Sequence, residues 1–312
     1  MTRILAHIHT MNDRDVIGRS VAAVRQQSRP LDGVLIVDNG STDGTLAQAF
    51  GDDVTVIEHG RNLGTSGSVH SGLAYALAHG WDWLWVFDAD SAPHPDALAR
   101  LLEYYESLPA AQRSQVHRLT SLAKDLSTGD EIRGFGVSDR GFCQATPAPG
   151  GRPYECIGTI WSGSLFRMDA VRATGLPNVD YMLDWAEVIY GYHAATMGFR
   201  TIMVPASRMD HNINTEIGAA AKARRVTLGP IRFTVLELAP VRFYYLVRND
   251  LYFWTREFDR RGIKSLLKLL PGWVWIPKIL IKFAVLGRWA EIGALLRGIR
   301  DGLVGRLDRR YP

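Results

Sequence analysis

The first hundred residues alternate between short apolar runs and segments with helical periodicity, and this alternation limits the fold more than any other feature of the sequence. Apolar runs typical of strands occupy residues 3–10, 33–40, 53–60 and 82–90, and helical patterns occupy residues 15–27, 41–50, 65–80 and 94–107. Strands and helices that alternate at this spacing predict a parallel sheet with right-handed crossovers. We therefore expect an α/β fold with a mostly parallel central sheet flanked by helices.

The pattern changes after residue 108. Residues 109–153 resemble hairpins, and a strand followed by a helix returns in residues 157–175. The aromatic-rich residues 178–200 predict a helix, and residues 201–213 predict a strand that runs into a loop. We expect the main domain to cover residues 1–240 and an amphipathic helical extension to cover residues 241–312.

Charge is unevenly distributed along the 312 residues. The chain has a net charge of +4, but residues 260–312 hold 12 Lys or Arg and 3 Asp or Glu, so this segment carries +9 and the preceding residues carry −5. Such asymmetry favours an anionic partner for the C-terminal region. Its lysines and tryptophans are interleaved with large aliphatic side chains, which is typical of a membrane interface rather than of a nucleic-acid site. The alternative is a helical hairpin packed on the main domain or on a second subunit.

Three features of the sequence bear on the cellular compartment and on whether the chain spans a membrane. The two cysteines, Cys143 and Cys156, are too few for a disulfide framework, so we expect a reducing compartment. The sequence does not begin with a charged region followed by an apolar core, so we expect no signal peptide. Nine uncharged residues separate Lys268 from Lys278. A helix needs roughly 20 apolar residues to span a bilayer, so we expect this segment not to span one.

Two carboxylates, Asp88 and Asp90, follow the apolar run "WLWVF". Ligands of parallel sheets bind at the carboxyl ends of strands, and residues two apart lie on the same side of a strand. Two carboxylates there suit Mg²⁺ or Mn²⁺, which prefer hard oxygen ligands. The alternative is a pair of turn-forming aspartates that cap the next helix.

A second cluster of polar residues follows the apolar run that starts at residue 33. It contains Asp38, Asn39, Ser41 and Asp43, which suit hydrogen bonding to a base or ribose. Further on, "RNLGTSG" from Arg61 places glycines before a helix N-terminus, which favours either phosphate binding or close chain packing. The alternative for this cluster of polar residues is a capped turn that binds no ligand.

Six motifs, taken in order, resemble glycosyltransferase family 2. They are "IHTMNDRDVIGRSVAAVRQQ", "VDNGSTDGT", "RNLGTSG…GLAYAL", "WVFDAD", "SGSLFR" and "DWAEVIYGYHAATMGFR", and the similarity runs from about Ile4 to His211. The resemblance implies the GT-A fold and a nucleotide-diphosphate sugar as donor. The stretch "MLDWAE" is similar to members that transfer rhamnose or galactofuranose.

The resemblance also implies residue roles on the donor side. Thr10 and Asp38 match positions that contact the nucleotide base, and "DAD" matches the family's DxD element, whose second carboxylate usually binds the metal on the donor diphosphate. A histidine that completes the metal site in related enzymes is matched by His211. The expected donor-binding residues are Thr10, Asp38, Asn39, Arg61, Asp88, Ala89 and Asp90, and the expected ligands of Mn²⁺ or Mg²⁺ are Asp88, Asp90 and His211.

On the acceptor side, the resemblance places the family's two carboxylates at Asp184 and Glu187. Glu187 falls at the usual base position, although the family usually has Asp there and has Arg where His193 stands. Inverting transfer needs a base for the acceptor hydroxyl and a cation for the departing diphosphate, and either carboxylate could be that base. The alternative is a carboxylate pair that complements a helix dipole. Trp161 and Ser162 are candidates for the acceptor site, because an aromatic face packs well on a sugar ring.

The sequence therefore predicts a metal-dependent, inverting glycosyltransferase at the cytoplasmic face of a membrane. The donor would carry rhamnose on dTDP or galactofuranose on UDP, and the acceptor would be a lipid-linked or cell-surface polysaccharide. We expect a membrane surface as a partner and no nucleic acid, and the sequence leaves open whether the chain forms a homo-oligomer. The alternatives are a membrane-docked nucleotide-sugar-binding subunit without activity and a sugar-phosphate nucleotidyltransferase.

Overall fold

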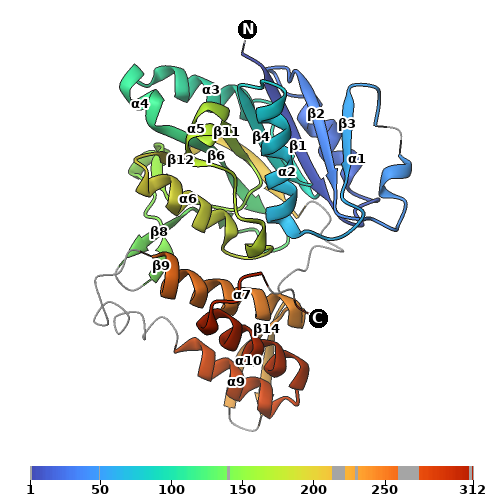
Figure 1. Cartoon of the computed structure of the whole chain (residues 1–312), viewed down its shortest axis with the longest axis vertical. Coiled ribbons are helices and arrows are strands. Elements are labelled where there is room, and N and C mark those ends of the chain that lie inside the picture. The colour runs from blue at the N-terminus through green and yellow to red at the C-terminus, as the bar shows by residue number, and fades with distance from the viewer. Residues whose placement is uncertain are drawn as a thin grey trace. The chain divides into compact units, whose positions relative to one another are not determined.

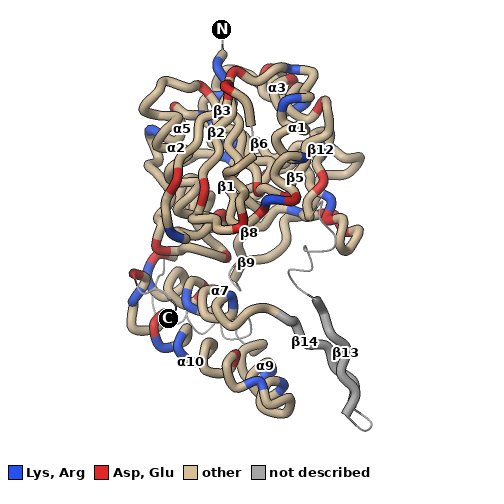
Figure 2. Tube along the Cα trace, turned by 90° about the vertical axis from the view of Figure 1, so that its right-hand side faces the viewer, with Lys and Arg blue, Asp and Glu red and all other residues tan. Residues whose placement is uncertain are grey.

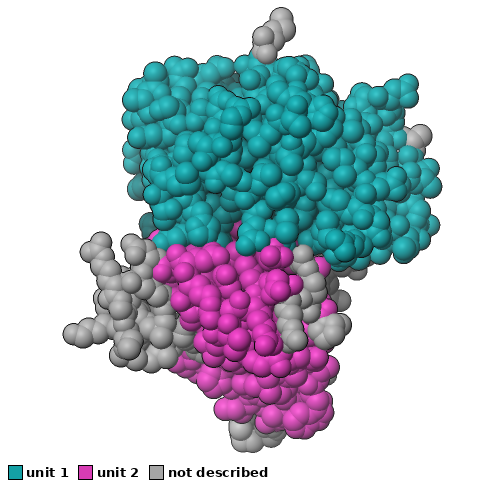
Figure 3. Space-filling model, viewed as in Figure 1, with its two compact units in different colours: residues 1–136, 144–179, 187–218 teal, residues 137–143, 180–186, 219–312 magenta. Residues whose placement is uncertain are grey.

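The computed structural model describes residues 2–48, 50–138, 141–212, 222–228, 231–258, 274–308 and 311, with the backbone alone for residues 222–228 and 231–237. The chain divides into two compact units (Figure 3). Unit 1 contains residues 1–136, 144–179 and 187–218, and unit 2 contains residues 137–143, 180–186 and 219–312. The predicted division at residue 240 stays a prediction.

Unit 1 is built on one large mixed sheet (Figure 1). Its strands are β1 (Ile4–Thr10), β2 (Gly33–Asp38), β3 (Val54–Glu58), β4 (Trp83–Asp88), β5 (Ser91–Pro93), β6 (Val116–Asp125), β7 (Glu131–Ile132), β10 (Tyr154–Cys156), β11 (Ser164–Arg167) and β12 (Arg200–His211). The main strand order is β10-β12-β6-β11-β4-β1-β2-β3, with β5 paired to β12 and β7 paired to β6. Strand β1 pairs in parallel with β2 and with β4, and β2 pairs in parallel with β3. Strand β11 lies between β4 and β6 and is antiparallel to both. The parallel sheet predicted from the alternation is therefore confirmed for the first four strands.

Helices cover both faces of this sheet. They are α1 (Ile17–Arg25), α2 (Gly64–Ala78), α3 (Ala97–Ser107), α4 (Ala110–Gln115), α5 (Met168–Thr174) and α6 (Ala186–Thr196). On one face, Ile8 of β1 packs in a buried cluster with Val21 of α1 and Leu98 of α3. On the other face, α2 approaches so closely that a Cβ at Gly72 would lie 2.7 Å from Nδ1 of His7. This two-sided burial explains the uninterrupted apolar strands.

Two predicted helices differ from the observed structure. Within the predicted helix at residues 41–50, the described residues form only a 3₁₀ turn at Thr45–Ala47, because the Asp38 and Asp43 carboxylates bond neighbouring backbone amides instead. The helix predicted from residue 178 begins only at Ala186, because Met182, Asp184 and Trp185 have positive φ. The hairpins predicted in residues 109–153 are confirmed by the antiparallel pair β6–β7 and by the two-stranded sheet of β8 (Phe135–Ser138) and β9 (Gly141–Gln144).

Unit 2 is mainly helical. It contains the hairpin of β13 (Lys222–Leu228) and β14 (Ile231–Glu237), then α7 (Pro240–Tyr252), a π-helical turn (Phe253–Glu257), α9 (Trp275–Val285) and α10 (Trp289–Val304). Helix α10 packs on α7 through small residues, since a Cβ at Gly298 would lie 2.6 Å from the carbonyl oxygen of Tyr244. Basic residues recur along α9 and α10 (Figure 2). Among the described residues, none of the helices has both the length and the apolar character needed to cross a membrane. Lys264, Lys268 and Trp273 of the predicted amphipathic region lie outside the described residues.

Candidate functional site

The polar residues predicted on the donor side gather where the parallel strands of unit 1 end. The register pairs His9 of β1 with Asp88 of β4, and Thr10 of β1 with Asp38 of β2. Chain segments that are far apart in sequence therefore present their last residues along one edge of the sheet. This edge is where open α/β sheets bind ligands.

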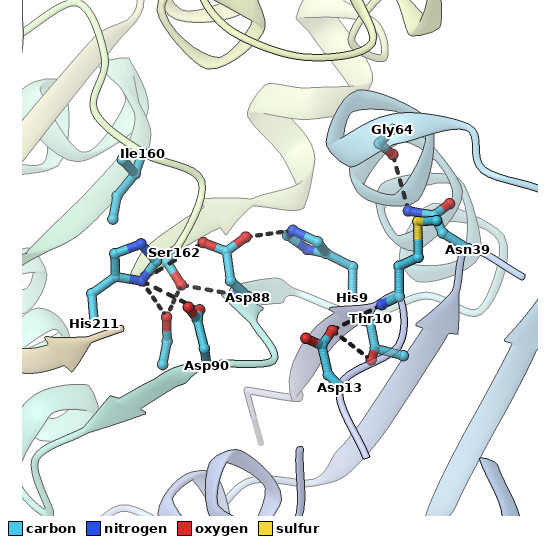
Figure 4. Close-up of polar contacts among 12 residues, drawn as sticks. His9, Thr10, Asp13, Asn39, Gly64, Asp88, Asp90, Ile160, Ser162 and His211 are labelled. Atoms are coloured by element: carbon cyan, nitrogen blue, oxygen red, sulfur yellow. Dashed lines mark hydrogen bonds and ion pairs between the residues drawn. The ribbon is translucent and has the colours of Figure 1, made fainter. Parts of the chain in front are cut away.

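Asp88, Asp90 and His211 form one cluster at this edge (Figure 4). The short strand β5 starts directly after Asp90 and pairs with the end of β12, which sets His211 opposite Ser91. Nδ1 of His211 lies 2.8 Å from Oγ of Ser91, 3.6 Å from Oδ1 of Asp90 and 3.9 Å from Oδ2 of Asp88. One potential ligand atom from each of the three residues lies within 4.8 Å of the others.

The two carboxylates of the cluster differ electrostatically. Burial alone would raise the pKa of Asp88, but the charge and hydrogen bond of His9, together with His211 and Ser162, lower it to about 2. Nε2 of His9 lies 2.5 Å from Oδ1 of Asp88. For Asp90 burial prevails, and with the nearby carboxylates of Asp88 and Asp13 it raises the pKa to about 6 against the opposing effect of His211. One carboxylate is thus held ionised at all ordinary pH values, while the other gains a proton in mild acid.

This donor set fits a divalent cation. Two carboxylates and one imidazole are the oxygen and nitrogen ligands that Mn²⁺ accepts. Ser91 contacts Nδ1 of His211, the ring nitrogen that faces both carboxylates, and so helps to orient the ring. A cation would bind either at Nε2 or at Nδ1 in place of this contact. A chain of hydroxyls fixes this part of the site further, because Oγ of Ser162 donates to Oγ of Ser91 at 2.8 Å and accepts the Asp88 amide at 2.9 Å.

The Asp38 side chain is engaged within its own turn. Its Oδ2 accepts hydrogen bonds from the amides of Gly40 and Ser41, both at 2.9 Å, and its Oδ1 accepts the Ser41 hydroxyl. Gly40 has φ +80°, and a Cβ there would lie 2.9 Å from the Arg61 amide nitrogen, so the exposed Arg61 is held beside this turn. The turn gives Asp38 a fixed orientation at the end of β2.

Asn39 braces the N-terminus of α2. Its Nδ2 donates to the Gly64 carbonyl at 3.3 Å, and its Oδ1 lies 3.0 Å from Nδ1 of His59 (Figure 4 draws the Gly64 bond). At the end of β1, Oγ1 of Thr10 donates to Oδ2 of Asp13 at 2.9 Å. Ala89 is buried between the two carboxylates of the cluster. Nucleotide contacts by these residues stay predictions.

The two acceptor-side candidates Trp161 and Ser162 are both buried. Ser162 belongs to the hydroxyl chain of the cluster, and the ring of Trp161 lies near Phe166 and Tyr190, with ring centroids 6.2 Å and 6.1 Å away. Their contact with an acceptor stays a prediction.

The two candidate bases lie in different units. Glu187 stands in the first turn of α6 in unit 1, where its backbone carbonyl accepts a hydrogen bond of 2.9 Å from Nη2 of the fully buried Arg118. Asp184 belongs to unit 2, where its Oδ1 lies 2.8 Å from Nη2 of Arg242. Arg242 thus pairs with the carboxylate of Asp184, whereas Arg118 contacts the backbone of Glu187.

Three of these contacts were not predicted from the sequence. The sequence motifs do not single out His9, Arg118 or Arg242 as functional residues. The strand pairing that sets His9 opposite Asp88 has no local sequence signal. Arg118 lies in β6, where polar and apolar residues are mixed, so no local pattern identifies it either.

Comparisons with known proteins give a partial match to one family model and several similar proteins. Residues 6–134 match the model of glycosyl transferase family 2. A galactofuranosyltransferase of Mycolicibacterium smegmatis is 28% identical over 200 residues, which cover 59% of this chain and 63% of that protein. The match therefore spans less than two thirds of that relative. A dTDP-rhamnosyl transferase of Shigella flexneri is 24% identical over 219 residues, which cover 69% of this chain and 68% of that protein.

Solved structures share the fold. A mannosyltransferase from Pyrobaculum calidifontis, solved in complex with GDP-Man and Mn²⁺, superposes with a TM-score of 0.55 over 97% of this chain and 88% of its own, at 14% identity. The predicted GT-A fold, with its mostly parallel central sheet flanked by helices, is confirmed.

Proposed function

We propose that this chain, whose residues 6–134 match the model of glycosyl transferase family 2, is a metal-dependent, inverting glycosyltransferase that uses a nucleotide-diphosphate sugar. The cluster of Asp88, Asp90 and His211 is the observation that carries this proposal. The solved mannosyltransferase of the same fold binds GDP-Man and Mn²⁺. A divalent cation at the cluster would stabilise the negative charge on the departing diphosphate.

The residues of this chain have separate tasks in the proposed reaction. Asp90 and His211 would hold the cation, and Asp88 remains ionised beside them because His9 lowers its pKa. Glu187 takes the proton of the acceptor hydroxyl while that oxygen forms its bond to the anomeric carbon. The bond from this carbon to the diphosphate oxygen breaks, and the nucleoside diphosphate leaves with the bonding electrons. Attack opposite the leaving group inverts the anomeric configuration.

The relatives suggest which donors to test first. One is named a galactofuranosyltransferase and another a dTDP-rhamnosyl transferase, which supports galactofuranose from UDP and rhamnose from dTDP. We propose a lipid-linked or cell-surface polysaccharide as acceptor.

The C-terminal helices support a peripheral position at the inner face of the cell membrane. Ile281, Val285 and Trp289 are exposed apolar side chains on or beside α9, and Lys278 and Lys282 lie on the same helix. Basic helices with exposed tryptophan and aliphatic side chains bind membrane interfaces. A membrane surface would also bring the enzyme to a lipid-linked acceptor.

Release of nucleoside diphosphate tests the activity. The purified chain would be incubated with UDP-, GDP- and dTDP-sugars, with Mn²⁺, Mg²⁺ or EDTA, beside Asp90→Ala and Glu187→Ala. We expect metal-dependent release from one donor, abolished by EDTA and reduced at least about 100-fold in both variants, since a general base and a charge-stabilising group each contribute on this scale. Asp96→Ala is the control, because Asp96 is an exposed aspartate paired to Arg100 on unit 1.

Two other outcomes would favour the alternatives. Nucleotide binding without release from any donor, even with a lipid-linked acceptor extract, would favour the inactive binding subunit. Release of pyrophosphate from a nucleoside triphosphate and a sugar phosphate would favour a nucleotidyltransferase.

A further inference from the structure

The turn at residues 182–185 leads directly into the helix that carries Glu187, and it has an unusual backbone. Among the described residues, five other than glycine have positive φ, and three of them are Met182 (+53°), Asp184 (+46°) and Trp185 (+69°). This region is unfavourable for side chains with a Cβ, and such conformations persist only where the surroundings impose them. The turn therefore needs an external restraint.

Helix α7 supplies that restraint through Asn249. The buried Nδ2 of Asn249 donates to the backbone carbonyls of Tyr181 at 2.7 Å, Leu183 at 2.5 Å and Asp184 at 2.8 Å. One amide group thus binds three carbonyls of a single turn. All of these residues belong to unit 2.

Arg248 fixes which way the Asn249 amide points. Nε and Nη2 of Arg248 lie 3.0 Å and 2.7 Å from Oδ1 of Asn249, and Nη2 also donates to the Asp180 carbonyl at 2.5 Å. A guanidinium can only donate, so the atom facing it must be the amide oxygen. The amide nitrogen must then face the turn.

Arg242, two turns before Asn249 on α7, binds the side chain of the same turn. Its Nη2 lies 2.8 Å from Oδ1 of Asp184, whose side chain is 16% exposed. If Asp184 accepted a proton, this ion pair would be lost together with part of the restraint on the turn. A carboxylate that is held in this ion pair is poorly suited to act as a base.

We propose that Arg242 and Asn249 form a clamp that holds the 182–185 turn, and that Asp184 is a positioning residue of this clamp while Glu187 alone is the base. The inference deepens the proposed function and rests on it. Helix α6 begins at Ala186, directly after this turn, so the clamp holds the residues from which the helix starts.

Kinetics of matched variants test whether Asp184 positions the turn while Glu187 acts as the base. Asp184→Asn, Arg242→Gln, their combination, Arg242→Lys and Glu187→Gln would be assayed for kcat, acceptor KM and pH profile. Arg288→Gln is the control, because Arg288 pairs with Glu291 in unit 2 away from the turn. We expect Asp184→Asn and Arg242→Gln to lower kcat about tenfold each, the double variant to be no worse than either single one, and Arg242→Lys to recover part of the loss. These variants should keep the acidic limb of the pH profile.

Assayed at saturating Mn²⁺, which competes with the proton at Asp90, Glu187→Gln should lower kcat at least about 100-fold and abolish the acidic limb. The opposite pattern, in which Asp184→Asn abolishes that limb and Glu187→Gln preserves it, would overturn the inference. Multiplicative losses in the double variant would also overturn it, because the two residues would then not act as a unit.

A measurement without activity separates this inference from the proposed function. Thermal unfolding midpoints of the same Asp184 and Arg242 variants report whether the two side chains are coupled. Non-additive shifts would support the clamp, and additive shifts would refute it, whether or not a donor is found. If the wild-type chain released no nucleoside diphosphate, the proposed function would fail separately.

Discussion

His117 is the residue whose burial has the clearest consequence for stability. It lies in β6 with its ring edge-on to Phe166 and Tyr190, and its Nε2 is 3.2 Å from Oγ1 of Thr174. Burial, together with the charges of Arg118 and Arg167, lowers its pKa to about 3. The folded protein therefore keeps His117 neutral at pH values where an unfolded chain protonates it.

This difference gives a pH dependence with a definite sign. Between about pH 6.5 and pH 3 the unfolded state binds the extra proton, so stability falls as pH falls, by up to about 1.4 kcal/mol per pH unit from this residue. We expect His117→Phe to flatten that decline. Denaturant unfolding at pH 7, 6 and 5 measures it, and parallel curves for the two proteins would contradict the assignment.

At the scale of elements, the glycines of α10 differ in what surrounds them. A Cβ at Gly298 would lie 2.6 Å from a backbone carbonyl of α7, and one at Gly302 would lie 2.8 Å from the Arg248 carbonyl. A Cβ at Gly293 would meet only the end of the Arg297 side chain, at 3.5 Å. Helix α10 thus has no room for a side chain at Gly298 but has room for one at Gly293.

We expect Gly298→Ala and Gly293→Ala to have opposite effects on stability. The first should destabilise the protein by about 1–3 kcal/mol, because α7 and α10 would be pushed apart. The second should stabilise it by up to about 1 kcal/mol, because alanine favours the helix. Chemical denaturation of both variants compares them, and equal shifts would show that α10 does not pack on α7 in this way.

Elements could be predicted from the sequence where one local pattern decides the structure. The four parallel strands and most helices of unit 1 have such patterns, and "VFDAD" indicated where the acidic cluster would form. The family resemblance grouped His211 with the two aspartates, but no local pattern predicts how they meet, because His211 reaches Asp90 through the pairing of β5 with β12. The late start of α6 depends on Asn249, 65 residues after Asp184. No local periodicity contains that information.

At the scale of the whole molecule, the charge asymmetry of the sequence coincides with exposed apolar side chains. Ile281 and Trp289 are 65% and 68% exposed. Ile281 lies on the basic helix α9, and Trp289 follows Arg288 at the start of α10. Anionic headgroups attract lysine and arginine near a membrane surface. The two features together support a docking surface for an anionic bilayer.

Vesicle sedimentation tests this surface. We expect the chain to bind vesicles that contain anionic lipid, to bind neutral vesicles much more weakly, and to lose binding as salt is raised. Ile281→Ser and Trp289→Ser should each weaken binding about tenfold, from the apolar area lost. Val56→Ser is the control, because Val56 is exposed on β3 of unit 1. Equal binding of all three variants would refute the docking surface.

The division into two units has a consequence for how this protein can be altered or inherited. The chain passes between unit 1 and unit 2 after residues 136, 143, 179, 186 and 218. No single cut therefore separates one unit from the other. A recombination that replaced only the C-terminal third would leave residues 180–186 behind with a foreign α7, so the two units should be inherited together.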